Sequence, residues 1–529
     1  MSIPWKSVGG YERTPIGNYA RFPYLVGGTG IGIFGGGGTG PTGLSGVTGP
    51  TGPSGGPIGP TGPSGPAFIT DSNTNATFFP VFVAGTGNQP LLADITTTPI
   101  SLNPSNGNFN VVDTMKITQD AVAIGKFAGQ TNQGAQSVAI GIVAGNANQR
   151  ANAVAIGNAA GSGNQEENAV AIGISAGQVT QRTNAVAIGN AAGTTNQQTG
   201  AVAIGGSAGN GSQAPNCVAI GNSAGNNTQE GGAVAIGWLA GQTTQRTNAV
   251  AIGNAAGRGN QQAAAVAIGQ DAGNGSQAAN AIAIGVRAGS NTQEGGAVAI
   301  GVSAGETTQR TNAVAIGQQA GQTNQQASAV AIGNGAGNTT QRTNAVAIGM
   351  NAGRTSQQAS AVAIGNGAGN TTQQADAVAI GQQAGQTNQQ PNAVAIGAIA
   401  GQIGQQASAV AIGASAGGNS QQTFAVAIGQ NAGTSSQQQG AIAIGQNAGQ
   451  GTTSSQGTNS IAIGVNAGVN SQTAGSICLN ASGGALNPAA AGFFVNPIRV
   501  GVAGSSFSPQ LPAGVLYFNA ATNEILRTS

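Results

Sequence analysis

The segment AVAIGKFAGQTNQGAQ, residues 121–136, is the first of a series of units that recur every sixteen residues along the chain. Each unit opens with an Ala-Val-Ala-Ile-Gly run or a close variant, continues with x-x-Ala-Gly, and carries a Gln eight residues beyond the first glycine. That glycine advances in steps of sixteen from Gly125 to Gly445, and two more units follow a short insertion. A short fixed period of this kind predicts an elongated stack in which each unit rests on its neighbours.

Within a unit, two apolar faces predict a short β-strand that is buried on both sides. Val122 and Ile124 point to one side of such a strand, and the alanines point to the other. We expect the larger side chains to fill the interior of a β-solenoid, so that Asp in place of Ile316 would disrupt the stack. The flat alanine face would then pack against sister chains around a symmetry axis. Gly125 and Gly129 suit corners where the backbone bends or needs a positive φ.

A column of glutamines favours stacking in register. Gln133, Gln149 and Gln165 each stand eight residues beyond the glycine of their unit, and the series continues without a gap to Gln437. Identical amides about 4.8 Å apart can donate to and accept from one another along the axis of a stack. We interpret this column as structural, since so many copies of a catalytic group would serve no purpose.

The position after each Gln carries most of the rare charges. Where neighbouring units both carry a charge there, the signs alternate, which favours weak pairs between exposed side chains. The pattern also has a wider period of 64 residues, which indicates duplication of a block of four units. We therefore expect a solvated edge that needs no ligand, formed by Arg150, Glu166, Arg182, Glu230, Arg246, Glu294 and Arg310.

Composition argues against several classes of function. Only 5% of the 529 residues are charged, His is absent, and the formal net charge is +2. The chain therefore lacks the commonest general base and metal ligand, and no excess of charge favours nucleic acid. Its apolar runs are too short to span a membrane, and its first residues lack the apolar core of a secretory signal. We expect synthesis in a cytoplasm, with no enzymatic activity, cofactor, metal, nucleic-acid partner or membrane span.

The two cysteines, Cys217 and Cys478, occupy alanine positions of the repeat and lie sixteen steps apart. At about 4.7 Å per step they would be separated by about 75 Å, which excludes a bond between them. We interpret both as small buried hydrophobic residues rather than as redox groups.

The solenoid, which we bound at residues 119–480, is flanked by segments of different character. Residues 37–67 follow a Gly-X-Y pattern with frequent Pro, which predicts a short collagen-like triple helix, with a flexible linker as the alternative. Since a collagen helix needs three chains, this segment independently predicts a trimer. Residues 68–118 read as a β-rich adaptor, and residues 481–529, where the repeat is lost, read as a β cap.

The first segment, residues 1–36, holds an unusual share of the aromatic residues, with basic residues among them. A short aromatic and basic segment beside a stalk suits an anchor that docks into the groove of a partner protein. A small trimeric cap is the alternative. The anchor residues would be Trp5, Tyr11, Tyr19 and Tyr24.

The repeated units, from residue 121 to about residue 480, resemble the β-roll heads of trimeric autotransporter adhesins. The flanks resemble modules in the fibre proteins of phages and large DNA viruses, on residues 75–83, 102–107, 492–499 and 516–519. Together these resemblances imply a trimeric fibre on a virion surface. Its N-terminus would dock to a virion or surface protein, and a host-surface glycan or receptor is a possible partner.

The fold that we expect is all-β: a trimeric parallel β-solenoid (β-roll) of sixteen-residue coils, preceded by a short collagen-like triple helix. Its expected function is that of a structural surface fibre, for attachment or as an outer fibril layer. The alternatives are a filament or adhesin on a spore or cell surface and, less favoured, an ice-binding solenoid, whose Thr column is irregular at Ala147, Gly163 and Val179. An enzyme is disfavoured because the acidic residues are scattered and no Ser has a His partner.

Overall fold

The computed structural model describes residues 120–452 and 454–498, together with short flanking stretches at 81–83, 91–93, 100–103, 108–111, 516–519, 521–522 and 524–527. The chain divides into two units, Met1–Asn110 and Val111–Ser529. In the N-terminal part, β1 (Val81–Val83) pairs antiparallel with β2 (Leu91–Ala93), and β3 (Ile100–Asn103) forms a second two-stranded sheet with β4 (Asn108–Val111). The expected anchor and collagen-like stalk, residues 1–67, lie outside the described residues.

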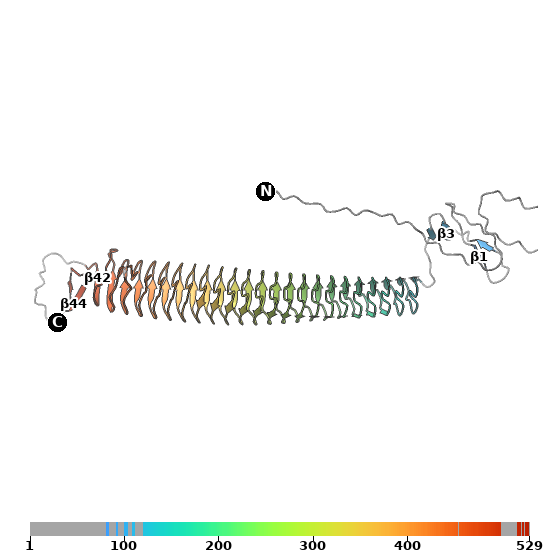
Figure 1. Ribbon diagram of the computed structural model, residues 1–529, viewed down its shortest axis with the longest axis horizontal. Helices are drawn as coiled ribbons and strands as arrows, with labels where there is room; N and C mark the ends of the chain where they lie inside the picture. Colours follow the sequence, from blue (N-terminus) through green and yellow to red (C-terminus); the bar gives the residue numbers. More distant parts are fainter. Residues whose placement is uncertain are drawn as a thin grey trace, which may run out of the picture. The chain divides into compact units, whose positions relative to one another are not determined.

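The repeat region is a parallel β-solenoid of about 23 coils, with about sixteen residues to each coil (Figure 1). The first strand of a coil covers three residues, Val-Ala-Ile or Ile-Ala-Ile. These strands recur every sixteen residues from β5 (Val122–Ile124) through β6, β7, odd-numbered β9 to β35, and β36 to β39 (Ile442–Ile444). After the insertion come β40 (Ile461–Ile463) and β41 (Ser476–Asn480). Neighbouring strands pair in register, as in Val186 opposite Val202, and the all-β solenoid expected from the repeat is confirmed.

A second, narrower face consists of two-residue strands that end at the Gln of each unit. They are the even-numbered strands from β8 (Asn164–Gln165) to β34 (Thr372–Gln373), also sixteen residues apart and parallel. Isolated bridges continue the pairing beyond both ends, for example between Gln149 and Gln165. Two short faces joined by tight corners leave only a narrow interior.

The corners need backbone of positive φ at fixed places. At Gly125 φ is 127°, and a Cβ added there would lie 2.5 Å from the carbonyl oxygen of Gly141 in the next coil. At Gly129 φ is 54°, and an added Cβ would meet the Gln133 side chain. A third position, just before the first alanine of each unit, also has positive φ and is often Asn, as at Asn168 with φ 58°. Asn tolerates the left-handed region better than most residues, which accounts for its recurrence there.

Alanine lines the interior, and this corrects the expectation that Val and Ile fill it. In β27 (Val314–Ile316), Ala315 is fully buried, whereas Ile316 keeps 37% of its surface exposed. In the first coil Val122 is half-buried and Ile124 is 51% exposed. The reason is the small distance between the two faces of the solenoid, which can pack closely only if the side chains between them are small. Larger β-branched residues therefore lie on the outer surface, and the alanines are not available to sister chains.

Strands of a different pattern close the C-terminal end of the stack. There β41 pairs in parallel with β42 (Gly492–Asn496), which pairs antiparallel with β44 (Glu524–Arg527). From the other side, β43 (Leu516–Asn519) pairs antiparallel with β44. In this last part of the core, Leu486 and Phe494 are buried together with the last alanines. Larger side chains and reversed pairing end the sixteen-residue coil and give the edge of β42 a partner.

Candidate functional surfaces

The glutamine column forms an amide ladder inside the solenoid. Gln309 Nε2 donates to Gln325 Oε1 at 3.0 Å, to the Val298 carbonyl oxygen at 2.7 Å and to the Ala313 carbonyl oxygen at 3.3 Å. The same three contacts recur in most coils, and these glutamines are buried. Among the described residues, no buried side-chain nitrogen or oxygen lacks a hydrogen-bond partner. The ladder therefore ties the two faces of each coil together and holds successive coils in register.

The ladder begins at the three glutamines singled out from the sequence. Gln133 is half-buried, and its Nε2 lies 3.5 Å from Gln149 Oε1, whereas Gln149 Nε2 donates to Gln165 Oε1 at 3.1 Å. The first rung is thus the longer of these two. The four aromatic residues of the expected anchor, Trp5, Tyr11, Tyr19 and Tyr24, lie outside the described residues.

An apolar strip runs along the outer side of the first strands, and we call it the Val/Ile strip. It consists of the two outward residues of each Val-Ala-Ile or Ile-Ala-Ile strand, from Val122 and Ile124 to Ile461 and Ile463. The first of the two is half-buried, and the second is half-buried or exposed in every coil. Contiguous apolar surface of this length is rare on a monomeric soluble protein. Sequence reasoning found these residues but placed them inside.

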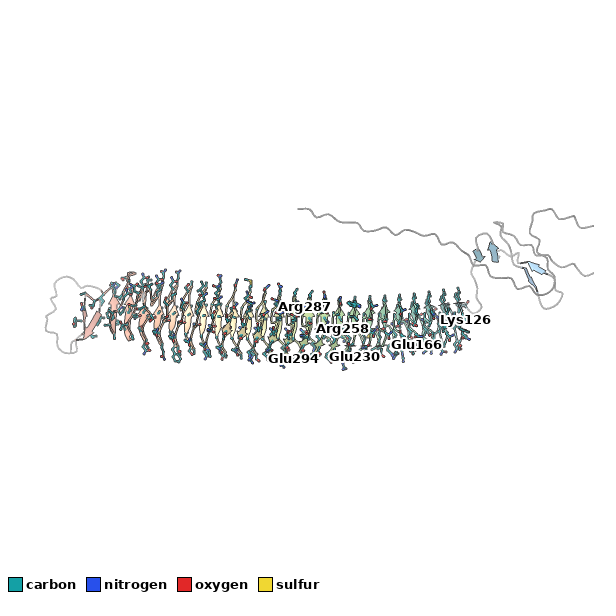
Figure 2. The ribbon with its side chains drawn as sticks, in the orientation of Figure 1. Lys126, Glu166, Glu230, Arg258, Arg287 and Glu294 are labelled. Atoms are coloured by element: carbon teal, nitrogen blue, oxygen red, sulfur yellow. The ribbon has the colours of Figure 1, made fainter. Side chains whose placement is uncertain are left out.

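Carboxylates bridge adjacent coils along one edge of the solenoid, where Figure 2 labels Glu166, Glu230 and Glu294. Glu230 Oε1 accepts from Arg246 Nη1 at 3.1 Å, and Glu230 Oε2 accepts from the backbone N–H and the hydroxyl of Thr247. Glu294 makes the same contacts one block of 64 residues later. All these groups are partly exposed, so each pair contributes a few tenths of a kcal/mol up to about 1 kcal/mol. These contacts link each coil to the next one, and they contribute little to the free energy of unfolding.

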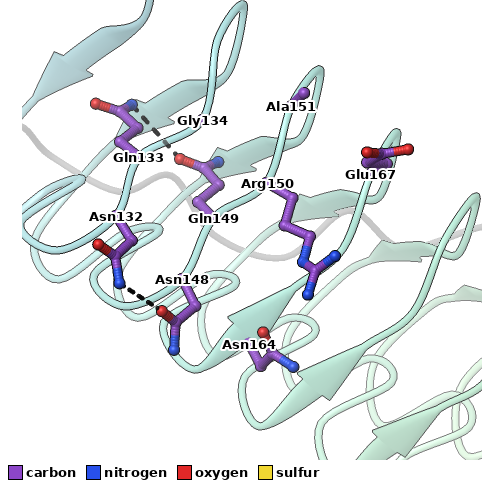
Figure 3. A pocket seen from close by; sticks show the side chains of 9 residues that line it. All are labelled: Asn132, Gln133, Gly134, Asn148, Gln149, Arg150, Ala151, Asn164 and Glu167. Atoms are coloured by element: carbon purple, nitrogen blue, oxygen red, sulfur yellow. Dashed lines mark hydrogen bonds between the residues drawn. The ribbon is translucent and has the colours of Figure 1, made fainter.

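A shallow hollow of about 810 Å³ lies on the first coils (Figure 3). Asn132, Asn148 and Asn164 form a column along it, and Asn132 Nδ2 donates to Asn148 Oδ1 at 2.9 Å. Arg150 and Glu167 add one charge of each sign. The hollow has the size of a ligand site, but no large hydrophobic or aromatic side chain lines it, unlike most such sites.

Both cysteines are free and buried at alanine positions of the core. Burial raises the pKa of the Cys217 thiol, although hydrogen bonds from the backbone of Ala233, Ala214 and Gly232 oppose the shift. Burial also raises the pKa of the Cys478 thiol, to about 11, against a smaller lowering by the Gly468 backbone. A thiol that stays protonated at neutral pH is a poor nucleophile, in line with a packing role.

Two kinds of feature are absent from the described residues. No group of three or more His, Cys, Asp and Glu gathers there as a metal-binding cluster. No helix in that part of the chain is long and apolar enough to cross a membrane.

Comparisons of the chain with protein-family models, with curated proteins and with solved structures found no match. The resemblances to adhesin heads and viral fibres therefore stand on the residue pattern alone.

Proposed function

We propose that this chain is a structural fibre protein that works as a homotrimer on the surface of a virion. The observation that carries the proposal is the Val/Ile strip, because it leaves apolar side chains uncovered along the full length of a stiff β-solenoid. The fibre mediates attachment or forms an outer fibril layer.

Three copies are the number that best suits the chain. The Gly-X-Y pattern of residues 37–67 requires three strands, and a solenoid with one apolar side can close around a three-fold axis. Covering the remaining third of each Ile contributes ~0.5–1 kcal/mol, and the sum over all coils is on the order of 10 kcal/mol per chain before association costs. This is enough to favour a stable assembly.

A fibre suits the proportions of the chain. About 23 coils at about 4.8 Å each give a rod of about 110 Å, and three-fold copies raise the avidity for a weakly bound surface. The aromatic segment at residues 1–36 would dock the fibre to the particle. The viral location rests on the resemblance of the flanks. The same trimeric rod could instead serve as a filament on a spore or cell surface, which is the alternative.

The native mass tests the trimer directly. Light scattering of the purified chain should give a mass near three times 50.7 kDa, and negative-stain images of the same sample should show thin rods. A monomer would overturn the trimer and leave the Val/Ile strip unexplained. Immunogold labelling with an antibody to residues 120–452 then distinguishes virions from spores or cell surfaces.

One feature of the solenoid favours the alternative of ice binding. The Thr column that is irregular in the first coils becomes regular later, with six consecutive threonines in register, five of them exposed: Thr307, Thr323, Thr339, Thr355, Thr371 and Thr387. Glu306 and Arg354 directly precede two of these threonines and bring charge to the array. We therefore keep the fibre as the conclusion and expect no thermal hysteresis in a cooled solution of the protein.

A further inference from the structure

The strongest unassigned feature of the solenoid is Trp238, one of only two tryptophans in the chain. It lies at a corner, just after β17 (Val234–Ile236) and Gly237, and 55% of its surface is exposed. Its indole N–H makes no hydrogen bond within the described residues. Tryptophan presents a broad apolar ring and one polar donor, and more than half of the surface of Trp238 is open to solvent.

The neighbours of Trp238 in the same column are Asn222 and Asn254, both exposed. At two other places in this column adjacent amides pair: Asn334 Nδ2 donates to Gln318 Oε1 at 3.1 Å, and Gln446 Nε2 donates to Gln430 Oε1 at 3.5 Å. Trp238 stands between Asn222 and Asn254, so these two amides do not pair with each other. The Asn254 amide makes no hydrogen bond within the described solenoid, and Asn222 uses only its Oδ1, which accepts from a neighbouring serine hydroxyl.

The backbone on which Trp238 stands is fixed from both sides. The Leu239 N–H donates to the Asn222 carbonyl oxygen at 3.0 Å, and the Ala255 N–H donates to the Trp238 carbonyl oxygen at 2.8 Å. The indole and the two amides therefore project from three hydrogen-bonded coils in succession. Because this backbone is already fixed, only the side chains have to become ordered when a ligand binds.

We propose that Trp238, Asn222 and Asn254 bind a neutral saccharide. The C–H face of a pyranose ring packs on the flat indole, while its hydroxyl groups lie around the ring edge where amides can donate to them and accept from them. The two amides stand two coils apart, about 10 Å, which suits a ligand of about two sugar rings. The three groups carry no charge, which favours a neutral sugar over an acidic one.

This site supplies a ligand class for the attachment role of the proposed fibre and rests on that function for its purpose. Binding by one chain does not require the trimer, so the two proposals fail separately. The mass measurement decides the oligomer, whereas a sugar titration decides the site.

The test uses the full chain with Trp5→Phe, so that the remaining tryptophan fluorescence reports on Trp238 alone. Triacetylchitotriose, lactose and maltotriose are each titrated to millimolar concentration. With at least one of them we expect saturable quenching or a blue shift of the Trp238 fluorescence. Isothermal titration calorimetry should detect the same binding without relying on fluorescence. No saturable change and no heat with any of the three sugars would overturn the proposal.

A matched pair of variants gives the control. Trp238→Asn restores the residue that occupies this column in several other coils, so folding is preserved, and it should abolish the calorimetric binding. Ile174→Asn removes a similarly exposed apolar residue, also flanked by Asn158 and Asn190, and should leave binding unchanged. If Trp238→Asn keeps sugar binding, or if it instead reduces the native mass, then Trp238 is not a sugar platform.

Discussion

Alanine at the buried position of each first strand sets the thickness of the solenoid. Ala315 is fully buried, and its Cβ faces an interior that in this part of the solenoid consists mainly of alanines and one Gln per coil. Replacing Ala315 with Val adds two methyl groups to a space that cannot widen without separating the faces. We expect a destabilisation of about 1–3 kcal/mol from this overpacking.

Thermal unfolding followed by circular dichroism measures this effect. The adjacent outward residue provides the control: Ile316→Val removes one methyl group from a partly exposed site and should change stability by much less. Equal effects of the two substitutions would mean that alanine does not line the interior.

Gln309 tests the amide ladder in the same coil region. Gln309→Leu removes the donor to the carbonyl oxygens of Val298 and Ala313 and leaves Gln325 Oε1 without its cross-coil donor. Leaving buried acceptors unpaired costs about 1–3 kcal/mol, so the local amide protons should exchange faster. Gln326→Leu, on the half-buried edge, is the matched control, and hydrogen exchange should detect little change there.

The Cys478 thiol predicts a dependence of stability on alkaline pH. Its folded-state pKa is raised to about 11, above the ordinary value of 9.0, because burial disfavours the thiolate. The unfolded chain therefore loses its thiol proton first, and stability that is present below about pH 9 is lost as the pH rises towards 11. Melting temperatures at pH 8 and pH 10.5 should differ less in Cys478→Ala than in the parent chain. An identical drop in both would assign the alkaline loss to other groups.

At the scale of the strand, the sequence indicated the period, the paired corners and the Gln ladder, but not which side of the strand faces inward. Alternation shows only that Val and Ile oppose the alanines, and both sets are apolar. The deciding quantity is side-chain volume. Each buried Gln must reach the backbone carbonyls of the opposite face, as Gln309 reaches Val298, so only a small side chain fits beside it. The sequence therefore could not place Val and Ile on the outer surface. Nor does the sequence alone show that Trp238 is exposed or that it lies between two exposed Asn side chains.

The roles of the two faces of one strand can be distinguished by placing the same charge first on the Val/Ile strip and then in the interior. Ile316→Asp puts a carboxylate on the strip, where the proposed partner chains meet, and should lower the native mass while the coils remain folded. Ala315→Asp buries the carboxylate among alanines and should unfold the surrounding coils, because an unpaired buried charge costs several kcal/mol. Light scattering and circular dichroism on the two variants distinguish these outcomes. A trimer that survives Ile316→Asp with an unchanged melting temperature would remove the strip from the interface.

At the scale of the whole solenoid, each coil contacts only its neighbours. The melting temperature should therefore depend more on whether successive coils stay in the sixteen-residue register than on the number of coils. Deleting residues 233–296 removes one block of 64 residues and joins Gly232 to Ala297. Glu230 then meets Arg310 and Thr311 in place of Arg246 and Thr247, and the Gln ladder continues. We expect a folded rod that is shorter by about 19 Å, four coils at about 4.8 Å.

Deleting residues 233–288 instead is the matched control, since it differs by half a coil. It brings the Gln of one coil opposite the wrong residues of the next and breaks the alanine core at the junction. This variant should show a lower melting temperature and a bend or break in negative-stain images, whereas the block deletion should melt like the parent chain. If both deletions are tolerated equally, register along the axis is not what holds the solenoid together. If neither is tolerated, the coils fold as one unit rather than as a stack of equivalent neighbours.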